Sequence, residues 1–198
     1  FGPACGDPND PPPRSSWHGT RVAGMVGALA SNGLGITGGT WQGAILPVRV
    51  LGKCGGYDSD IIAAMRWSAG LPVPGRPDLV NPTPAQVLNL SLGSETSCSN
   101  SYRTVMSELT AAGVLVVASA GNENGPVNAP ANCPGVLAVA GLRHVGTKVG
   151  YSSFGSQVEV AAPAGNCVDE PPNPCLFSLV TTSNSGLTTP GSSIYTDE

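Results

Sequence analysis

The chain has 198 residues, of which 40% are hydrophobic and 11% are charged, and its formal net charge is −4. This length and apolar content suit one domain, or most of a larger one, with a sizeable core. Basic runs are absent, so nucleic acid is not expected as a partner. The apolar stretches are short and interrupted by glycine, so no membrane span is predicted. The opening residues lack the charged and apolar regions of a signal peptide, as expected of a mature secreted chain.

Apolar positions at helical or strand spacing, separated by turns rich in glycine and proline, predict alternating helices and strands. Helices are predicted over 18–30, 58–69 and 99–112, and strands over 45–51, 87–91, 114–120, 136–140 and 158–162. The unbroken apolar run at 114–120 is typical of a strand covered on both faces. This alternation predicts an α/β fold, a parallel sheet with helices on both faces. In such folds the functional side chains gather at the carboxyl ends of strands and at helix starts.

Six cysteines are spread widely along the chain: Cys5, Cys54, Cys98, Cys133, Cys167 and Cys175. They form no Cys-x-x-Cys pair and no zinc-finger spacing with the two histidines, so zinc is not expected. An even number at wide spacing indicates disulfides and an oxidising compartment, with free buried cysteines as the alternative. We predict pairing in chain order, Cys5–Cys54, Cys98–Cys133 and Cys167–Cys175.

Three short motifs carry residues suited to acyl transfer. His18 opens the first predicted helix, where an imidazole held at a fixed angle can act as general base for a hydroxyl nucleophile. Asn122 follows the strand 114–120, where its amide could donate to an oxyanion, although a turn asparagine fits the pattern equally well. The segment 89–94 offers backbone to an extended peptide, or is an ordinary exit from a strand.

In this order the motifs resemble those of the subtilisin-like serine proteases, the subtilases. They read His-Gly-Thr-x-Val-Ala-Gly at 18–24, Asn-Leu-Ser-Leu-Gly at 89–93 and Ala-Ser-Ala-Gly-Asn at 118–122. Further similarity at 134–141 and 151–163 extends the resemblance over nearly the whole chain. It implies a subtilisin-like fold and a secreted endopeptidase that cleaves peptides or proteins through an acyl-enzyme. It also implies that His18 is the general base and Asn122 the oxyanion donor.

The same resemblance implies a set of substrate-binding residues. One side of the cleft would consist of Ser91, Leu92 and Gly93, and the pocket for the residue before the scissile bond would consist of Ser119, Ala120 and Gly121. The segment Gly55-Gly56-Tyr57 would pair with the peptide further upstream. Small side chains around Ala120 and Gly121 leave room for a large apolar side chain of the substrate.

Structural calcium is a further implication, because many subtilases bind this ion in surface loops. Asp58 and Asp60 are candidate ligands, although helix capping and charge compensation in the first helical turn explain both residues as well. No organic cofactor is expected. His144 matches no motif and is interpreted as a solvated turn residue.

The chain departs from the family pattern at two members of the catalytic triad. The family order is Asp, His, Ser, but Asp7 and Asp10 lie in a proline-rich stretch that cannot form the expected strand. No Gly-Thr-Ser motif occurs, and the near-match Gly191-Ser192-Ser193-Ile194 lacks the helix that should follow. Arg21 replaces a second histidine of many relatives, outside the triad.

We therefore expect 1–198 to be the central portion of a catalytic domain, incomplete at both ends and inactive alone. Its missing segments would be a separate chain or further residues of the same one. The alternative is a non-catalytic peptide-binding protein on a subtilase scaffold. A doubly wound nucleotide-binding domain is disfavoured, because no Gly-x-Gly-x-x-Gly motif joins a strand to a helix.

Overall fold

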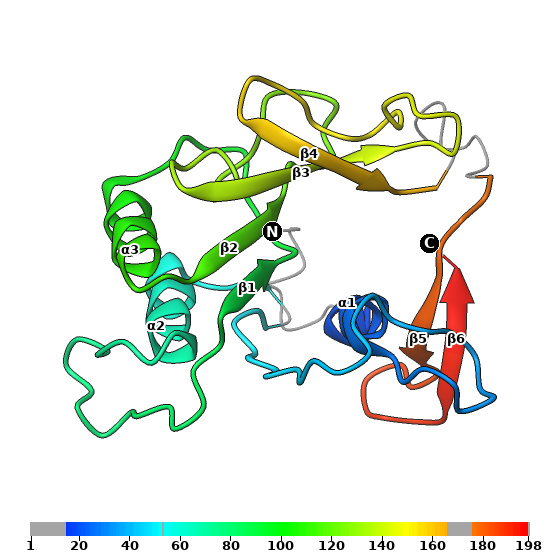
Figure 1. Ribbon diagram of the computed structural model, residues 1–198, viewed down its shortest axis with the longest axis horizontal. Coiled ribbons are helices and arrows are strands. Elements are labelled where there is room, and N and C mark those ends of the chain that lie inside the picture. Colours follow the sequence, from blue (N-terminus) through cyan, green and yellow to red (C-terminus); the bar gives the residue numbers. More distant parts are fainter. Residues whose placement is uncertain (1–14, 53, 166–175, 198) are drawn as a thin grey trace, which may run out of the picture. The chain divides into compact units, whose positions relative to one another are not determined.

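The computed structural model describes residues 15–52, 54–165 and 176–197. The chain divides into two compact units (Figure 1). Unit 1 comprises Phe1–Tyr57 with Leu179–Glu198, and unit 2 comprises Asp58–Ser178. None of the described helices is long and apolar enough to cross a membrane.

Unit 2 is built on a four-stranded sheet in which all strands are parallel. The strands are β1 (Val87–Leu90), β2 (Leu115–Ser119), β3 (Val136–Leu142) and β4 (Val158–Pro163), and they pair in chain order. The register shifts between Ala138 and Val139, where β3 meets β4. Parallel neighbours require long crossover connections, and α3 (Asn100–Ala111) supplies the one between β1 and β2. The predicted α/β fold with a parallel sheet is thus confirmed.

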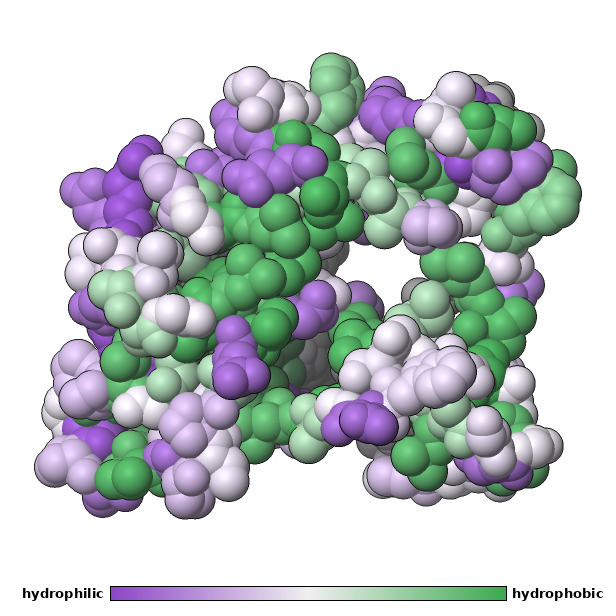
Figure 2. Space-filling view, in the orientation of Figure 1, coloured by the Kyte–Doolittle hydropathy of each residue, from purple (hydrophilic) through white to green (hydrophobic). Residues whose placement is uncertain are grey.

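One face of this sheet forms the core of unit 2. Leu88, Val116 and Val136 are register partners across β1, β2 and β3, and all three are buried on the same face. Helix α3 packs against β2 and against α2 (Asp58–Ser68). The opposite face carries Val87 and Leu115, which are 54% and 45% exposed. Figure 2 shows hydrophobic residues gathered over these strands. Along β2, buried Val116 and Ala118 alternate with the less buried Leu115, Val117 and Ser119.

The two helices of unit 2 are joined by polar contacts. Ser99 caps α3, because its Oγ accepts a hydrogen bond from the Tyr102 N–H at 3.3 Å. The Tyr102 hydroxyl donates to Asp58 Oδ1 at 3.1 Å, and burial beside this carboxylate raises the pKa of Tyr102. Arg66 forms a bidentate ion pair with Glu108 at 2.6 and 2.9 Å.

Unit 1 holds α1 (His18–Gly27) against a two-stranded antiparallel hairpin, β5 (Val180–Asn184) and β6 (Ser193–Asp197). Two threonine hydroxyls of β5 donate to α1 carbonyls: Thr181 Oγ1 to Arg21 O at 2.6 Å and Thr182 Oγ1 to Thr20 O at 2.8 Å. Gly24 is buried here, and a Cβ atom on it would overlap Thr182 Oγ1. The glycine is therefore required for this close packing of helix on hairpin.

Two predictions for unit 1 were wrong, the strand at 45–51 and the end of the first helix, and one hairpin was missed. The segment 45–51 is not a strand, and its apolar side chains Ile45, Leu46 and Val48 are exposed. A strand needs a hydrogen-bonded neighbour. Pro47 has no N–H to donate to one, and the two strands of unit 1, β5 and β6, pair with each other and not with this segment. The hairpin β5–β6 was not predicted, because its strands are rich in serine and threonine and lack apolar alternation. The first helix also ends earlier than predicted, at Gly27, where the chain turns so that the Gly38 N–H donates to the Ala28 carbonyl.

Candidate active site

An open pocket of about 290 Å³ lies at the carboxyl ends of strands β1 and β2 in unit 2. Its lining includes five predicted site residues, Ser91, Ser119, Ala120, Gly121 and Asn122. Apolar side chains complete part of the surface: Val117, Ala118, Val139 and Ala140. The structure thus brings the two motifs 89–93 and 118–122 together at one pocket. This is the position in a parallel sheet where ligands are expected.

Asn122 follows a backbone turn that only glycine accommodates well. Gly121 has a φ of 115°, and a Cβ atom on it would lie 2.6 Å from Glu123 Oε2 and 2.7 Å from Asn128 Nδ2. The Ala120 N–H donates to the Val139 carbonyl at 2.9 Å, which fixes the end of β2 against β3. Asn122 itself is exposed. Its side-chain amide is therefore available to a ligand at the pocket.

The carboxylate of Glu123 organises this turn. Glu123 Oε2 accepts hydrogen bonds from the Asn122 N–H at 2.8 Å, from Asn128 Nδ2 at 2.6 Å and from Ser153 Oγ at 3.2 Å. Asn128 and Ser153 are buried, so the carboxylate connects the turn to fixed parts of unit 2. Hydrogen bonds to a charged acceptor are stronger than neutral ones. Sequence reasoning missed this residue, whose only signal was an acidic side chain directly after Asn122.

The segment after β1 is fastened to the segment that precedes β3. Ser94 and Ala129 exchange two backbone hydrogen bonds of 2.9 and 3.1 Å. A Cβ atom on Gly93 would lie 2.9 Å from the Ala129 carbonyl, so the approach is close. Leu92 and Gly93 are therefore held directly beyond the pocket residue Ser91, although neither lines the pocket.

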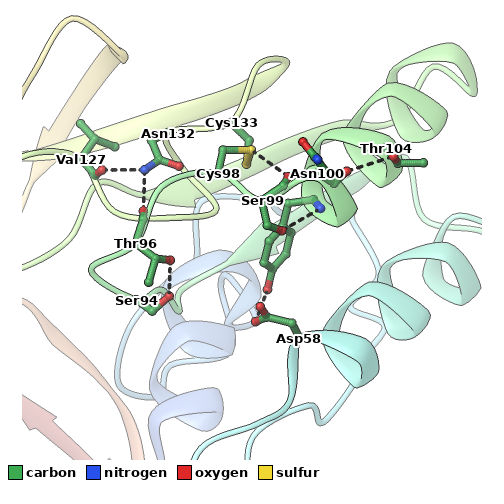
Figure 3. The surroundings of a disulfide bond; sticks show 11 residues. Asp58, Ser94, Thr96, Cys98, Ser99, Asn100, Thr104, Val127, Asn132 and Cys133 are labelled. Carbon is green, nitrogen blue, oxygen red and sulfur yellow. Dashed lines mark hydrogen bonds between the residues drawn. A yellow bond between two sulfur atoms is a disulfide. The ribbon is translucent and has the colours of Figure 1, made fainter.

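A disulfide reinforces the same connection, as Figure 3 shows. Cys98 and Cys133 are bonded, with Cα atoms 5.1 Å apart, which confirms this predicted pair. Asn132 Nδ2 donates to the Thr96 carbonyl at 2.8 Å and to the Val127 carbonyl at 3.0 Å. The segment that follows Ser91 and the segment that precedes β3 are thus joined by a covalent bond and by a set of hydrogen bonds.

His18 lies in unit 1, at the first residue of α1. The preceding Trp17 has a left-handed φ of 54°, and its indole Nε1 donates to the Gly186 carbonyl at 2.7 Å. The His18 N–H lies 3.3 Å from Ser16 Oγ. These contacts fix the start of the helix within unit 1. Gly55 belongs to the same unit and exchanges backbone hydrogen bonds of 2.7 and 3.3 Å with Gly52, next to Gly56. The joint action of His18, Gly55 and Gly56 with the pocket of unit 2 stays a prediction.

Comparison with known proteins establishes the family. The model of the subtilase family matches residues 3–196. The chain belongs to the subtilase family.

Two similar proteins are named as extracellular proteases. The extracellular protease of Xanthomonas campestris pv. campestris is 43% identical over 187 residues, which are 93% of this chain and 30% of that protein. The extracellular basic protease of Dichelobacter nodosus is 43% identical over 167 residues, 82% of this chain and 27% of that protein. A solved structure, titled as proteases from Pseudoalteromonas arctica PAMC 21717, has a TM-score of 0.86 and 40% identity. The alignment covers 94% of this chain and 54% of the chain in that structure. The chain thus spans less than a third of these two relatives.

The structure describes some of the other cysteines and acidic residues that were predicted to have a role, but not all of them. Cys54 is disulfide-bonded, whereas Cys5, Cys167 and Cys175 lie outside the described residues, so two predicted pairings stay predictions. Asp7 and Asp10 also lie outside them. Within the described ranges, no group of three or more His, Cys, Asp or Glu residues could hold a metal ion. Of the two candidate calcium ligands, Asp58 accepts the Tyr102 hydroxyl, and both lie in the first turn of α2.

His144 lies in the turn after β3 and is exposed, as expected. Its ring lies against the ring of Phe177, with centroids 4.3 Å apart and ring planes tilted by 37°. Ser193 and Ile194 lie in strand β6, so the serine of the near-match at 191–194 does not begin a helix.

Proposed function

We propose that this subtilase is a secreted serine endopeptidase that hydrolyses peptide bonds through an acyl-enzyme. The observation that carries the proposal is the pocket of unit 2, which Asn122 lines together with Ser91 and residues 119–121. Relatives named extracellular proteases and a disulfide at Cys98–Cys133 support secretion.

The proposed chemistry assigns a role to each motif that carries the resemblance. A serine outside residues 1–198 attacks the scissile carbonyl, and His18 takes its proton as general base. The carbonyl oxygen becomes negative in the tetrahedral intermediate, where the Asn122 amide donates to it. Collapse expels the amine, which receives the proton from His18. Water, deprotonated by His18, then attacks the acyl-enzyme; collapse releases the acid, and the serine oxygen takes the proton back from His18.

The pocket also supports a substrate preference. Its volume of about 290 Å³ and its small and apolar lining residues, among them Ala118, Ala120 and Val139, suit a large apolar side chain before the scissile bond. The backbone at Ser91, Leu92 and Gly93 would pair with the substrate as an added strand. Gly55 and Gly56 would extend this pairing upstream.

The triad serine and aspartate are proposed to come from segments outside residues 1–198, in the same chain or a separate one. The absence of both motifs supports this proposal, as does the share of the relatives that the chain spans. Calcium stays an expectation of the family resemblance. Loss of thermal stability on chelation, reversed by calcium alone, would establish it.

The experiment that tests the function is labelling of the secreted protein with a fluorophosphonate probe, followed by intact mass and peptide mapping. We expect a labelled serine outside residues 1–198 and turnover of a chromogenic peptide with a large apolar side chain. The polypeptide 1–198 alone should show neither. A full-length protein that binds peptides but is never labelled would instead identify a peptide-binding protein on this scaffold.

A further inference from the structure

Lys148 places its ammonium group inside a ring of oxygen atoms next to the pocket. Its Nζ lies 3.0 Å from the Val149 carbonyl, 3.1 Å from the Gly150 carbonyl and 3.0 Å from the Ser152 carbonyl. The fourth oxygen is Asn124 Oδ1, at 2.7 Å. An ammonium has three N–H donors, so four acceptors share them. This is the environment of a small cation held by backbone carbonyls.

The carbonyls belong to one segment, residues 148–154, which we term the support loop. Two of its residues, Tyr151 and Ser152, line the pocket. Ser152 Oγ accepts a hydrogen bond from the Gly141 N–H at 2.9 Å, and the Val149 N–H donates to the Gly141 carbonyl at 3.0 Å. The support loop is therefore fixed to the end of strand β3. Lys148 is half-buried, and its Nζ lies 5.4 Å from the centre of the Phe154 ring, a cation–π distance.

The support loop pairs with the turn that carries Asn122. The Ser153 N–H donates to the Gly121 carbonyl at 2.9 Å, the Asn124 N–H to the Tyr151 carbonyl at 2.8 Å, and the Phe154 N–H to the Gly125 carbonyl at 2.9 Å. Asn122 thus lies between Gly121 and Asn124, and both of these residues are hydrogen-bonded to the support loop. Any shift of this loop would be transmitted to both sides of Asn122.

Lys148 spans the two segments at their junction. Three of its acceptors belong to the support loop, and the fourth is the side chain of Asn124, two residues after Asn122. Asn124 has a left-handed φ of 49°, an unfavourable conformation for most residues, and its hydrogen bond to the ammonium favours it.

We propose that Lys148 is a positioning residue for the oxyanion donor Asn122, and that its ammonium does so as an internal cation for the support loop. The proposal rests on the proposed role of Asn122. A donor aimed at the oxyanion must be in place before reaction, since reorganisation would consume part of its benefit. The ammonium supplies this order through its hydrogen bonds to both segments.

The first test is Lys148→Met in the full-length protein, because methionine keeps the apolar stem and removes all three donors. We expect kcat to fall about tenfold, less than the 10²–10³ for complete loss of a donor, with KM changed less than about threefold. Arg143→Met is the matched control: it removes the same charge from the same turn, where Arg143 Nε contacts Thr147 Oγ1. If kcat is equal in Lys148→Met and wild type, at a temperature well below that at which either protein unfolds, the proposal is overturned.

The second test is cation rescue of Lys148→Ala, which removes the ammonium and most of the stem that carries it. Ammonium ions should restore kcat, whereas tetramethylammonium at matched ionic strength should not, because it has no N–H donors. Wild type and Arg143→Met should respond to neither salt. Equal responses to both salts would contradict a cation site.

The third test keeps the proposal separate from enzymatic activity. In Lys148→Met, hydrogen exchange should accelerate by about tenfold or more at the amides of Asn122 and Asn124, and stay unchanged in α3. Unchanged exchange at these amides would refute the positioning role, even if the wild type proves not to be a protease. An unlabelled, inactive wild type would refute the proposed function alone. Should Lys148→Met fail to fold, Asn124→Gly removes the fourth acceptor while permitting the left-handed φ, and should change kcat and exchange in the same direction.

Discussion

The disulfide Cys98–Cys133 should contribute about 4 kcal/mol to the stability of the protein. The two cysteines are 35 residues apart. Closing a loop of that length lowers the conformational entropy of the unfolded chain by about 13 cal/mol/K, which raises its free energy by about 4 kcal/mol at room temperature. The folded state should change little without the bond, because the Ser94–Ala129 pair and the two hydrogen bonds of Asn132 also join the segments. The loss should therefore come almost entirely from the unfolded state.

The measurement is urea unfolding of the double variant Cys98→Ala/Cys133→Ala in the full-length protein, with the nucleophile blocked to prevent self-digestion. We expect a free energy of unfolding lower by about 4 kcal/mol. The same variant with its nucleophile left free should keep a kcat within about threefold of wild type. Ser97→Ala, at an exposed neighbour, should change stability by less than about 0.5 kcal/mol. A loss below about 1 kcal/mol in the double variant would refute the loop-entropy argument.

Four further predictions concern single residues. Asn122→Ala should lower kcat by about 10²–10³ with little change in KM, a range known from subtilisin itself, and His18→Ala should abolish fluorophosphonate labelling. Gly24→Ala should cost about 1–3 kcal/mol in thermal unfolding, because its Cβ overlaps Thr182 Oγ1, whereas Gly19→Ala meets nothing within 4 Å and should cost nothing. Glu108→Gln tests the ion pair with Arg66, which lowers the pKa of Glu108. This stabilisation is present above the unfolded pKa of about 4.3 and is lost as pH falls through the lower folded value. Solvent screening limits it to less than about 1 kcal/mol, and the variant should lack this pH dependence.

The elements of unit 2 could be predicted because their signals are local. Helix α3 begins after a capping serine, and Val105, Met106 and Leu109 recur at helical spacing, so sequence and structure agree within one residue. The segment 45–51 has the same apolar character as β2, yet it forms no strand. Apolar character alone therefore decides neither burial nor strand formation, because a strand also depends on a partner elsewhere in the chain. The hairpin β5–β6 is the converse case, because its pairing is set by register and not by hydrophobicity.

In the candidate site, too, some residues could be predicted from local sequence signals and others could not. Asn122 and Ser91 could be found from short motifs, and the structure places both at one pocket. Glu123 and Lys148 could not, because a charged residue in a polar loop is usually solvated. What distinguishes them is the set of carbonyl, amide and hydroxyl groups that converge on each charge. Those groups come from segments up to 30 residues away, as with Glu123 and Ser153.

Glu123 and Lys148 compensate for the poor packing of the turn that carries Asn122. An exposed asparagine after a glycine, in a turn with little apolar burial, would sample many orientations, and ordering it costs conformational entropy. Burial cannot offset that cost here, because the amide must stay open to the substrate. Charged hydrogen bonds can, since Glu123 holds the turn from its own side and Lys148 holds it from the support loop. The residues that make Asn122 effective are therefore expected among the polar groups behind the turn, and substitutions there should affect catalysis more than substitutions of equal size in the apolar core.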